Sequence, residues 1–291
     1  MVTSGFDKNG KPLSFYIDQN LKDALDIAKK RVEKRNWDYA SVVSGIPGSG
    51  KSAFARTVAK YCDPTFDESR IAFKVEGKDG GFIDITNRVP NNSAVILDES
   101  FESLNSRVSM SPDFLRIINH LQIIRQKNLF ILLCLPNFFD LSKSIAVFRA
   151  SHLFVVYASS SGERGKFLAF GRDSKRKLYV KGGKYMDYSA EPANFIGRFT
   201  RNDHICDITK YDQMKFEHLQ SKQKEIKVKK DPNIKRDIAI WKMKNEKEMR
   251  ATEISEIYDI NVATVHRSVN LVQDTLEREK IDIKTLQRRS K

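Results

Sequence analysis

The chain has 291 residues, of which 40% are hydrophobic and 30% are charged. This balance is typical of folded globular proteins and excludes a mostly disordered chain. The longest apolar run, residues 129–135, is far shorter than the roughly 20 residues of a membrane helix. Asp7 and Lys8 stand where a signal peptide would be apolar. We therefore expect a cytoplasmic protein with no membrane contact.

Basic side chains are in excess. There are 51 Lys and Arg residues against 37 Asp and Glu residues, which gives a formal net charge of +14. Such an excess favours a polyanionic partner, and the alternative is a soluble protein that is merely basic. The three cysteines are too few and too widely spaced for a disulfide framework or a metal site.

Helical and strand-like patterns alternate over residues 1–205, which predicts an α/β domain with a mainly parallel sheet. Apolar residues at helical spacing predict a helix over 20–35. Pro112, between a serine and an aspartate, is typical of a helix start, and this helix is expected to end near Lys127. The expected strands are residues 39–44, 93–97, 129–135 and 153–158.

A glycine-rich motif follows the first of these strands. Residues 45–52 read GIPGSGKS and match the phosphate-binding pattern G-x-x-x-x-G-K-[ST]. The order of strand, loop and helix turns backbone N–H groups toward a phosphate. Lys51 would neutralise the β- and γ-phosphates of ATP, and the Ser52 hydroxyl would bind Mg²⁺. The predicted nucleotide-binding residues are Gly45, Pro47, Gly48, Ser49, Gly50, Lys51, Ser52 and Ala53.

Two adjacent acids end the second strand. Asp98 and Glu99 follow four apolar residues, at the place where enzymes with a phosphate loop carry their magnesium-associated carboxylate. We expect Asp98 to hold Mg²⁺ and Glu99 to polarise the attacking water, which favours hydrolysis over transfer to a small acceptor. The alternative is a pair of solvated carboxylates at a turn.

The next segments resemble the order found in AAA+ and related additional-strand ATPases. Strand 129–135 is followed by Asn137, a short helix and then Arg149. The resemblance implies that Asn137 orients the water or the γ-phosphate, and that Arg149 reaches the nucleotide of a neighbouring subunit in an oligomer. Arg125 is a competing candidate for this role, and either arginine could instead interact with a helix C-terminus.

Longer segments resemble one family more closely. Over residues 15–211 the chain is similar to the Zot-like ATPases of phages and mobile elements, relatives of the FtsK and HerA motors. The segments that carry this resemblance include FYID, SGIPGSGKSAFAR, SAVILDES, LPNFFDL and FIGRF. The chain departs from filamentous-phage Zot proteins because it lacks their membrane-spanning segment.

Two regions are candidates for DNA contact. Residues 161–187 hold eight basic and three acidic residues, and their alternation predicts a β-hairpin near 164–181. The residues expected to contact phosphates are Lys166, Arg172, Lys175, Arg176, Lys177 and Lys181. The alternative is an exposed hairpin that only aids solubility.

The second candidate region follows a helical, basic linker over residues 206–233. Residues 234–291 are expected to form an all-α domain with a helix-turn-helix, in which Ile254, Ile257, Ile260 and Val265 form the core. The residues expected to face DNA are Thr264, His266, Arg267 and Asn270. The alternative is a helical bundle that docks a protein.

Together these features predict a P-loop ATPase that uses ATP and Mg²⁺, with an appended hairpin and a C-terminal helix-turn-helix. Its expected role is a homo-oligomeric, ring-shaped motor that moves or packages phage or mobile-element DNA, with protein partners from the same element. Two alternatives are an ATP-switched DNA-binding regulator or loader, and an ATPase that binds a protein partner without touching DNA.

Overall fold

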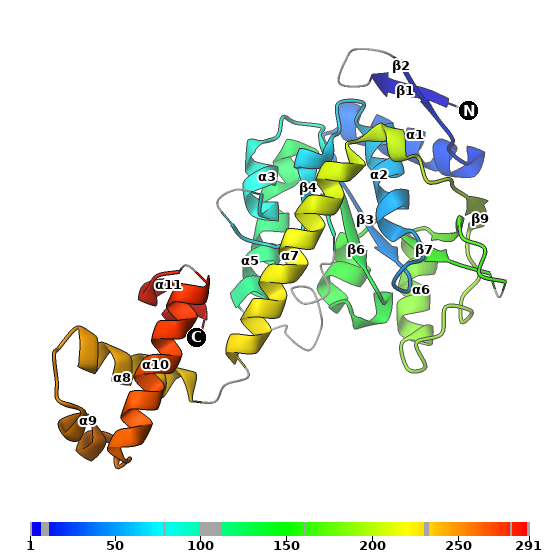
Figure 1. Ribbon diagram of the computed structural model, residues 1–291. Helices are drawn as coiled ribbons and strands as arrows, with labels where there is room; N and C mark the ends of the chain where they lie inside the picture. The colour runs from blue at the N-terminus through cyan, green and yellow to red at the C-terminus, as the bar shows by residue number, and fades with distance from the viewer. Residues whose placement is uncertain are drawn as a thin grey trace. The chain divides into compact units, whose positions relative to one another are not determined.

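The computed structural model describes residues 2–6, 12–77, 80–98, 112–159, 161–229, 233–279 and 281–289 (Figure 1). The chain forms two compact units, Met1–Asp212 and Gln213–Lys291. The division falls within α7 (Ile208–Lys229), a helix that covers most of the predicted linker. Among the described residues, no helix has both the length and the apolar composition of a membrane-spanning segment.

The first unit contains a seven-stranded sheet with the order β4-β5-β6-β3-β7-β8-β9. Neighbouring strands from β4 to β7 pair in parallel, and β8 and β9 are added antiparallel. The predicted mainly parallel sheet is therefore confirmed. The strands are β3 (Tyr39–Ser44), β4 (Ile71–Ala72), β5 (Ala94–Leu97), β6 (Phe130–Leu135), β7 (His152–Tyr157), β8 (Lys166–Phe170) and β9 (Phe195–Arg198). A separate antiparallel pair is formed by β1 (Val2–Phe6) and β2 (Pro12–Phe15).

The central strands β3 and β6 pair along their whole length, from Tyr39 opposite Phe130 to Ser44 opposite Leu135. All six residues of each strand are buried. A strand that is buried on both faces reads as a continuous apolar run, which is why these two strands were the easiest to predict.

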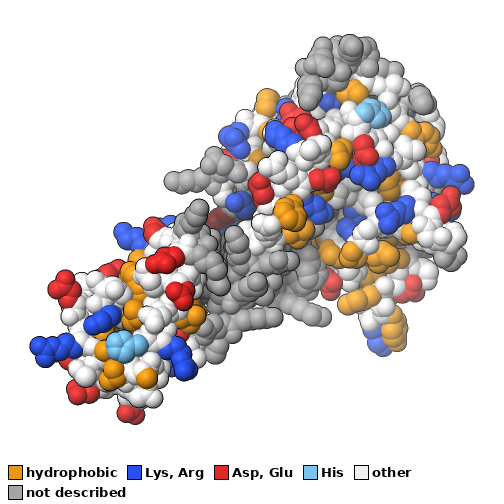
Figure 2. Space-filling view, viewed as in Figure 1, with side chains coloured by type: hydrophobic (Ala, Val, Ile, Leu, Met, Phe, Trp, Pro, Cys, Tyr) orange, Lys and Arg blue, Asp and Glu red, His pale blue; other side chains and the backbone are white. Residues whose placement is uncertain are grey.

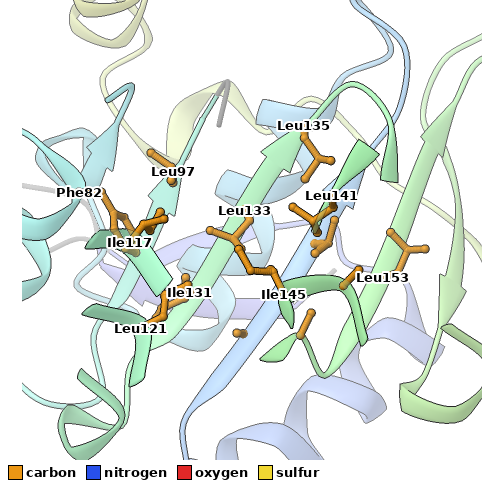
Figure 3. Packing of buried hydrophobic residues seen from close by; sticks show 14 of the residues in the cluster. Phe82, Leu97, Ile117, Leu121, Ile131, Leu133, Leu135, Leu141, Ile145 and Leu153 are labelled. Carbon is orange, nitrogen blue, oxygen red and sulfur yellow. The ribbon is translucent and has the colours of Figure 1, made fainter. Parts of the chain in front are cut away.

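Helices cover both faces of the sheet (Figure 1). One face packs against α3, α5, η5 and α6 through a cluster in which Leu97, Ile131 and Leu133 from the strands meet Ile117 and Ile145 from the helices (Figure 3). The other face packs against α2, whose Phe54 contacts Phe154 and Phe167. The helices of this unit are α1 (Gln19–Arg35), α2 (Lys51–Cys62), α3 (Phe82–Arg88), α5 (Pro112–Ile123) and α6 (Arg172–Gly182), and η5 (Ser144–Arg149) is a π-helix. Short 3₁₀ helices are η1 (Glu68–Arg70), η3 (Ile124–Lys127), η4 (Phe138–Asp140) and η6 (Asp203–Ile205).

The predicted hairpin near 164–181 is wrong. Its first half is β8, a strand of the main sheet, and its second half is the helix α6. Lys175 and Leu178, three residues apart, are both buried on one side of this helix. The alternating pattern was misleading because Lys175, counted as an exposed phosphate contact, is fully buried and donates from Nζ to the carbonyl oxygens of Ala146 and Val147.

The described part of the second unit, Gln213–Lys291, is helical. Its further helices are α8 (Ile234–Asn245), α9 (Ala251–Tyr258), α10 (Val262–Glu279) and α11 (Ile283–Arg289). Ile254 of α9 and Val265 of α10 are buried with Ile240 of α8, and Ile260 is partly buried against them. Ile257 was expected in this core but is 57% exposed, so that part of the prediction is wrong.

Burial of Lys175 predicts a pH-dependent stability. Desolvation lowers the pKa of its ammonium group from 10.5 to about 8. Between these two values the unfolded chain keeps a proton that the folded chain has lost, so the stability should rise with pH. Relative to Lys175→Met, the wild type should gain up to about 3 kcal/mol between pH 8 and 10.5, at about 1.4 kcal/mol per pKa unit. Urea unfolding across this range measures the difference, and a constant difference would contradict the prediction.

Candidate functional site

The phosphate-binding motif forms a loop between β3 and α2, as predicted. Gly45, Gly48 and Gly50 all have positive φ angles, of 153°, 79° and 101°. A Cβ atom on Gly45 would lie 2.1 Å from the Val156 carbonyl oxygen, so no side chain fits there. The Gly45 amide donates to the Pro136 carbonyl at 3.3 Å, which places the loop beside the end of β6.

Two side chains of the loop are placed to receive an anion. Nζ of Lys51 donates to the carbonyl oxygens of Gly45 (2.7 Å) and Ile46 (2.9 Å), so its ammonium group lies over the loop. Oγ of Ser49 is buried and has no hydrogen-bond partner among the described residues. A cradle of glycines with a cation over it and an unpaired hydroxyl fits a phosphate group.

Asp98 and Ser52, the two predicted Mg²⁺ ligands, meet at one tyrosine hydroxyl. Asp98 follows β5, is 1% exposed, and accepts a hydrogen bond of 2.7 Å from the Tyr211 hydroxyl. The Ser52 hydroxyl lies close enough to the same tyrosine oxygen to lower its pKa. The structure therefore brings Ser52 and Asp98 to within reach of one atom, as a shared metal ion would require.

Tyr211, which the sequence analysis did not single out, belongs to the first turn of α7. Its ring contacts Arg56, whose guanidinium carbon is 4.5 Å from the ring centre, and Phe73, at 5.7 Å between ring centres. Burial is the largest cause that raises the pKa of its hydroxyl above 10. The hydroxyl therefore stays protonated and donates to Asp98.

Asn137 lies at the end of β6, next to the loop, as the resemblance implied. Its side-chain oxygen accepts from the Phe139 amide at 3.3 Å and from the Tyr188 hydroxyl at 3.1 Å, and its Nδ2 donates to Asp140 at 3.0 Å. Tyr188 is also 3.0 Å from the Ser44 hydroxyl, at the last residue of β3. These bonds hold the amide in a fixed orientation at the carboxyl edge of the sheet.

Arg149 and Arg125 lie at the opposite edge. Arg149 forms an ion pair with the buried Asp38 and donates to the Leu121 carbonyl at 3.1 Å. Asp38 precedes β3 and the phosphate loop follows it, so the strand separates them by about 20 Å at 3.3 Å per residue. Arg125 stacks over Trp37 at 5.0 Å. Both arginines make contacts within the chain at this edge, and their proposed reach toward a neighbouring subunit stays a prediction.

Arg164 lies beside the phosphate loop. It belongs to the connection from β7 to β8, and its Nη2 lies 3.9 Å from the position that a Cβ atom on Gly48 would occupy. The side chain is exposed. Glu99, the predicted water-activating residue, lies outside the described residues.

Most of the basic residues predicted to bind DNA in the first unit have other contacts. Lys166 pairs with Glu163 at 2.9 Å. Lys181 and Lys177 both face Glu191, at 2.7 and 3.8 Å. On α6, Arg172 and Arg176 are exposed. Figure 2 shows basic and acidic side chains interspersed among the described residues of the face that it draws.

In the second unit, the predicted turn between two helices is present. Asp259 takes a left-handed conformation with φ 50°, and the Asn261 side chain accepts from the Thr264 amide at 2.8 Å and hydroxyl at 2.9 Å. Thr264 is half-buried, whereas His266, Arg267 and Asn270 are exposed on α10. These three side chains are available to a partner.

The Arg149 ion pair predicts a stability effect. Arg149→Ala would leave the Asp38 carboxylate, 5% exposed, without its partner, and breaking a buried pair costs about 3–5 kcal/mol. Arg125→Ala, the matched control at the same edge, should cost about 1 kcal/mol or less. Urea unfolding of both variants measures this. An unchanged stability in Arg149→Ala would mean that the ion pair does not hold the fold.

No family model matches the chain, and none of the curated proteins matches it. Among solved structures, the chain is similar to the N-terminal domain of zonular occludens toxin from Neisseria meningitidis (TM-score 0.40, 16% identity, 58% of this chain and 97% of that one). It is also similar to the genome packaging NTPase B204 of Sulfolobus turreted icosahedral virus 2 (TM-score 0.33, 14% identity, 47% of this chain and 93% of that one). A third similar structure is the cytoplasmic domain of the Type VII Secretion ATPase EccC from Thermomonospora curvata (TM-score 0.34, 13% identity, 69% of this chain and 28% of that one). The structures similar to this chain thus include a zonular occludens toxin domain, in line with the resemblance stated from the sequence.

Proposed function

We propose that the chain is a nucleoside triphosphatase that hydrolyses ATP with Mg²⁺. The observation that carries this proposal is the meeting of three features at the carboxyl edge of the sheet. The phosphate loop follows β3, Asp98 follows β5, and Asn137 follows β6. Parallel strands place their carboxyl ends at one edge, which is where open α/β sheets bind ligands.

In this proposal Lys51 and the loop amides bind the phosphates, and Ser52 and Asp98 hold the metal ion. Mg²⁺, when bound, would neutralise charge on the phosphates. Glu99, next to Asp98, would act as the base that takes a proton from the attacking water, and Asn137 would orient that water. Arg164, beside Gly48, would stabilise negative charge on the γ-phosphate from within the same chain.

We propose that this ATPase acts as a motor and that DNA is the substrate it moves. The net charge of +14 and the exposed His266, Arg267 and Asn270 on α10 support this step. A helix that follows a tight turn and exposes polar side chains in its first turns can enter a major groove. We propose that ATP hydrolysis in a homo-oligomer, with a ring as its expected form, drives movement or packaging of phage or mobile-element DNA.

One observation favours a second candidate, an ATP-switched DNA-binding protein. Tyr211 contacts both Asp98 and Ser52 and lies in α7, which continues into the unit that carries α10. A ligand that displaces the tyrosine hydroxyl would change the start of that helix. A motor should hydrolyse ATP faster as the DNA is lengthened, whereas a switch should show no such dependence.

Two substitutions test the ATPase. Lys51→Ala should abolish binding of ATP because it removes the cation over the phosphate loop. Glu99→Gln should bind ATP normally but hydrolyse it about 10²-fold more slowly or worse, because only the base is lost. Turnover and equilibrium binding of a fluorescent ATP analogue measure both effects. Lys143→Ala, an exposed lysine outside the loop, is the control. Normal hydrolysis by both variants would exclude this site.

The role of α10 predicts a loss of DNA affinity. Arg267→Ala should weaken binding to a selected duplex by about 1–3 kcal/mol if the side chain reaches a base edge. Arg288→Ala, an exposed arginine on α11, should bind as the wild type does. Fluorescence anisotropy at several salt concentrations measures the difference. If the wild type shows no affinity for any duplex even at low salt, the ATPase that binds only a protein partner becomes the better account.

A further inference from the structure

A cleft with an arginine-rich wall lies at the amino edge of the sheet, away from the phosphate loop. We call it the arginine cleft. Its cavity has a volume of about 490 Å³ and is lined by Arg31, Arg35, Trp37, Ser151, His152 and Arg172. The residues come from the end of α1, the start of β7 and the start of α6. This volume lies within the range of about 300–1,000 Å³ that is usual for small-molecule sites.

The positive charge of this cleft is not compensated. Among the residues that the structure describes, no acidic side chain lines the cavity, and Arg31, Arg35 and Arg172 form no ion pair. The carboxylate that lines the adjoining cavity, Asp38, is already paired with Arg149. Three exposed guanidinium groups around one cavity therefore attract an anion, and their planar donor geometry suits phosphate.

Two neutral groups in the cleft add hydrogen-bonding capacity. Ser151 and His152 line the cleft, and the buried Nδ1 of His152 has no hydrogen-bond partner among the residues described. Burial and the charges of Arg31, Lys175 and Arg172 lower the pKa of His152 to about 4. The imidazole is neutral at pH 7 and adds no charge of its own, so it can donate or accept one hydrogen bond.

An apolar extension adjoins the charged part. A second cavity of about 220 Å³ shares Arg31, Trp37, Ser151 and His152 with the first. Its other lining residues are mostly apolar and comprise Ala24, Ile27, Ala28, Tyr39 and Asp38, of which Asp38 is paired with Arg149. Trp37 is 43% exposed and Ile27 is 54% exposed, so both are accessible from solvent. Arg125 covers one face of the Trp37 ring at 5.0 Å, so a base would stack on the other face. An exposed tryptophan next to uncompensated arginines is the combination that binds a stacked base and its phosphate.

We propose that the arginine cleft binds a nucleoside phosphate, with the phosphate on Arg31, Arg35 and Arg172 and the base against Trp37. An inorganic anion would use only the arginines and would leave the apolar extension exposed. The ligand's source is either a free nucleotide or a nucleotide of a single strand, and the two share this chemistry. The cleft lies at the opposite edge of the sheet from Lys51, so the proposal does not depend on hydrolysis at the phosphate loop.

The test uses the full chain with Lys51→Ala, which disables the phosphate loop. The probe is a fluorescein-labelled (dT)₁₂ strand, whose anisotropy reports binding, with unlabelled ATP as a competitor. Arg31→Ala with Arg35→Ala removes two cleft arginines from α1. Lys30→Ala with Lys34→Ala is the matched control, because it removes the same charge from the same helix at exposed positions outside the cleft.

The variant with both arginines replaced should bind the strand at least tenfold more weakly than the variant with both lysines replaced. It should also lower the slope of log K against log salt by about 1.4, since each phosphate contact to a single strand contributes about 0.7. Trp37→Leu should weaken binding of the strand but leave affinity for inorganic tripolyphosphate unchanged, because only the strand has a base to stack. Displacement of the strand by micromolar ATP would assign the cleft to a free nucleotide, and binding of the strand alone would assign it to nucleic acid.

Equal binding by the arginine and lysine pairs would overturn the proposal. Competition by polyglutamate as effective as that by ATP, with no effect of Trp37→Leu, would also overturn it in favour of an acidic protein surface. Circular dichroism of each variant checks the fold. Because every protein in this test lacks Lys51, a failure here leaves the proposed ATPase untouched, and a failure of the ATPase leaves this result interpretable.

Discussion

The position of β3 in the centre of the sheet is the constraint on which the site depends. Its hydrogen bonds to β6 on one side and β7 on the other fix where the chain leaves the sheet. The loop that follows must therefore lie between the ends of its neighbours, beside Pro136 and Val156. Because β5 pairs with β6, Asp98 reaches the same edge. Packing of an apolar sheet thus determines the spacing of the polar groups.

The same edge is also where α7 begins. Tyr211 is held by Arg56 and Phe73, and its hydroxyl donates to Asp98 and lies beside the Ser52 hydroxyl. Any cation that binds both of these oxygens competes with a hydrogen bond from the helix that leads to the second unit. Binding at the site and the conformation of the start of α7 are therefore energetically linked, and a change at either one affects the other.

Much of the fold could be predicted from the sequence because its strands are short apolar runs and its phosphate loop is a local motif. The residues 39–44 form a strand as predicted, and Gly45 to Ser52 form the loop. Prediction failed where tertiary contacts override local pattern. Lys175 reads as a surface lysine yet is buried against backbone carbonyls. Tyr211 lies 113 residues from Asp98 in sequence, and no local signal connects the two.

The central claim is that the carboxyl edge of the sheet binds a nucleotide with its metal ion. The most direct measurement is an anomalous difference map from crystals grown with Mn²⁺ and a non-hydrolysable ATP analogue. The account predicts one manganese peak between the Ser52 hydroxyl and the Asp98 carboxylate, with the phosphates of the analogue over Gly48 and Lys51. Analogue bound elsewhere, with no manganese at Ser52, would contradict it.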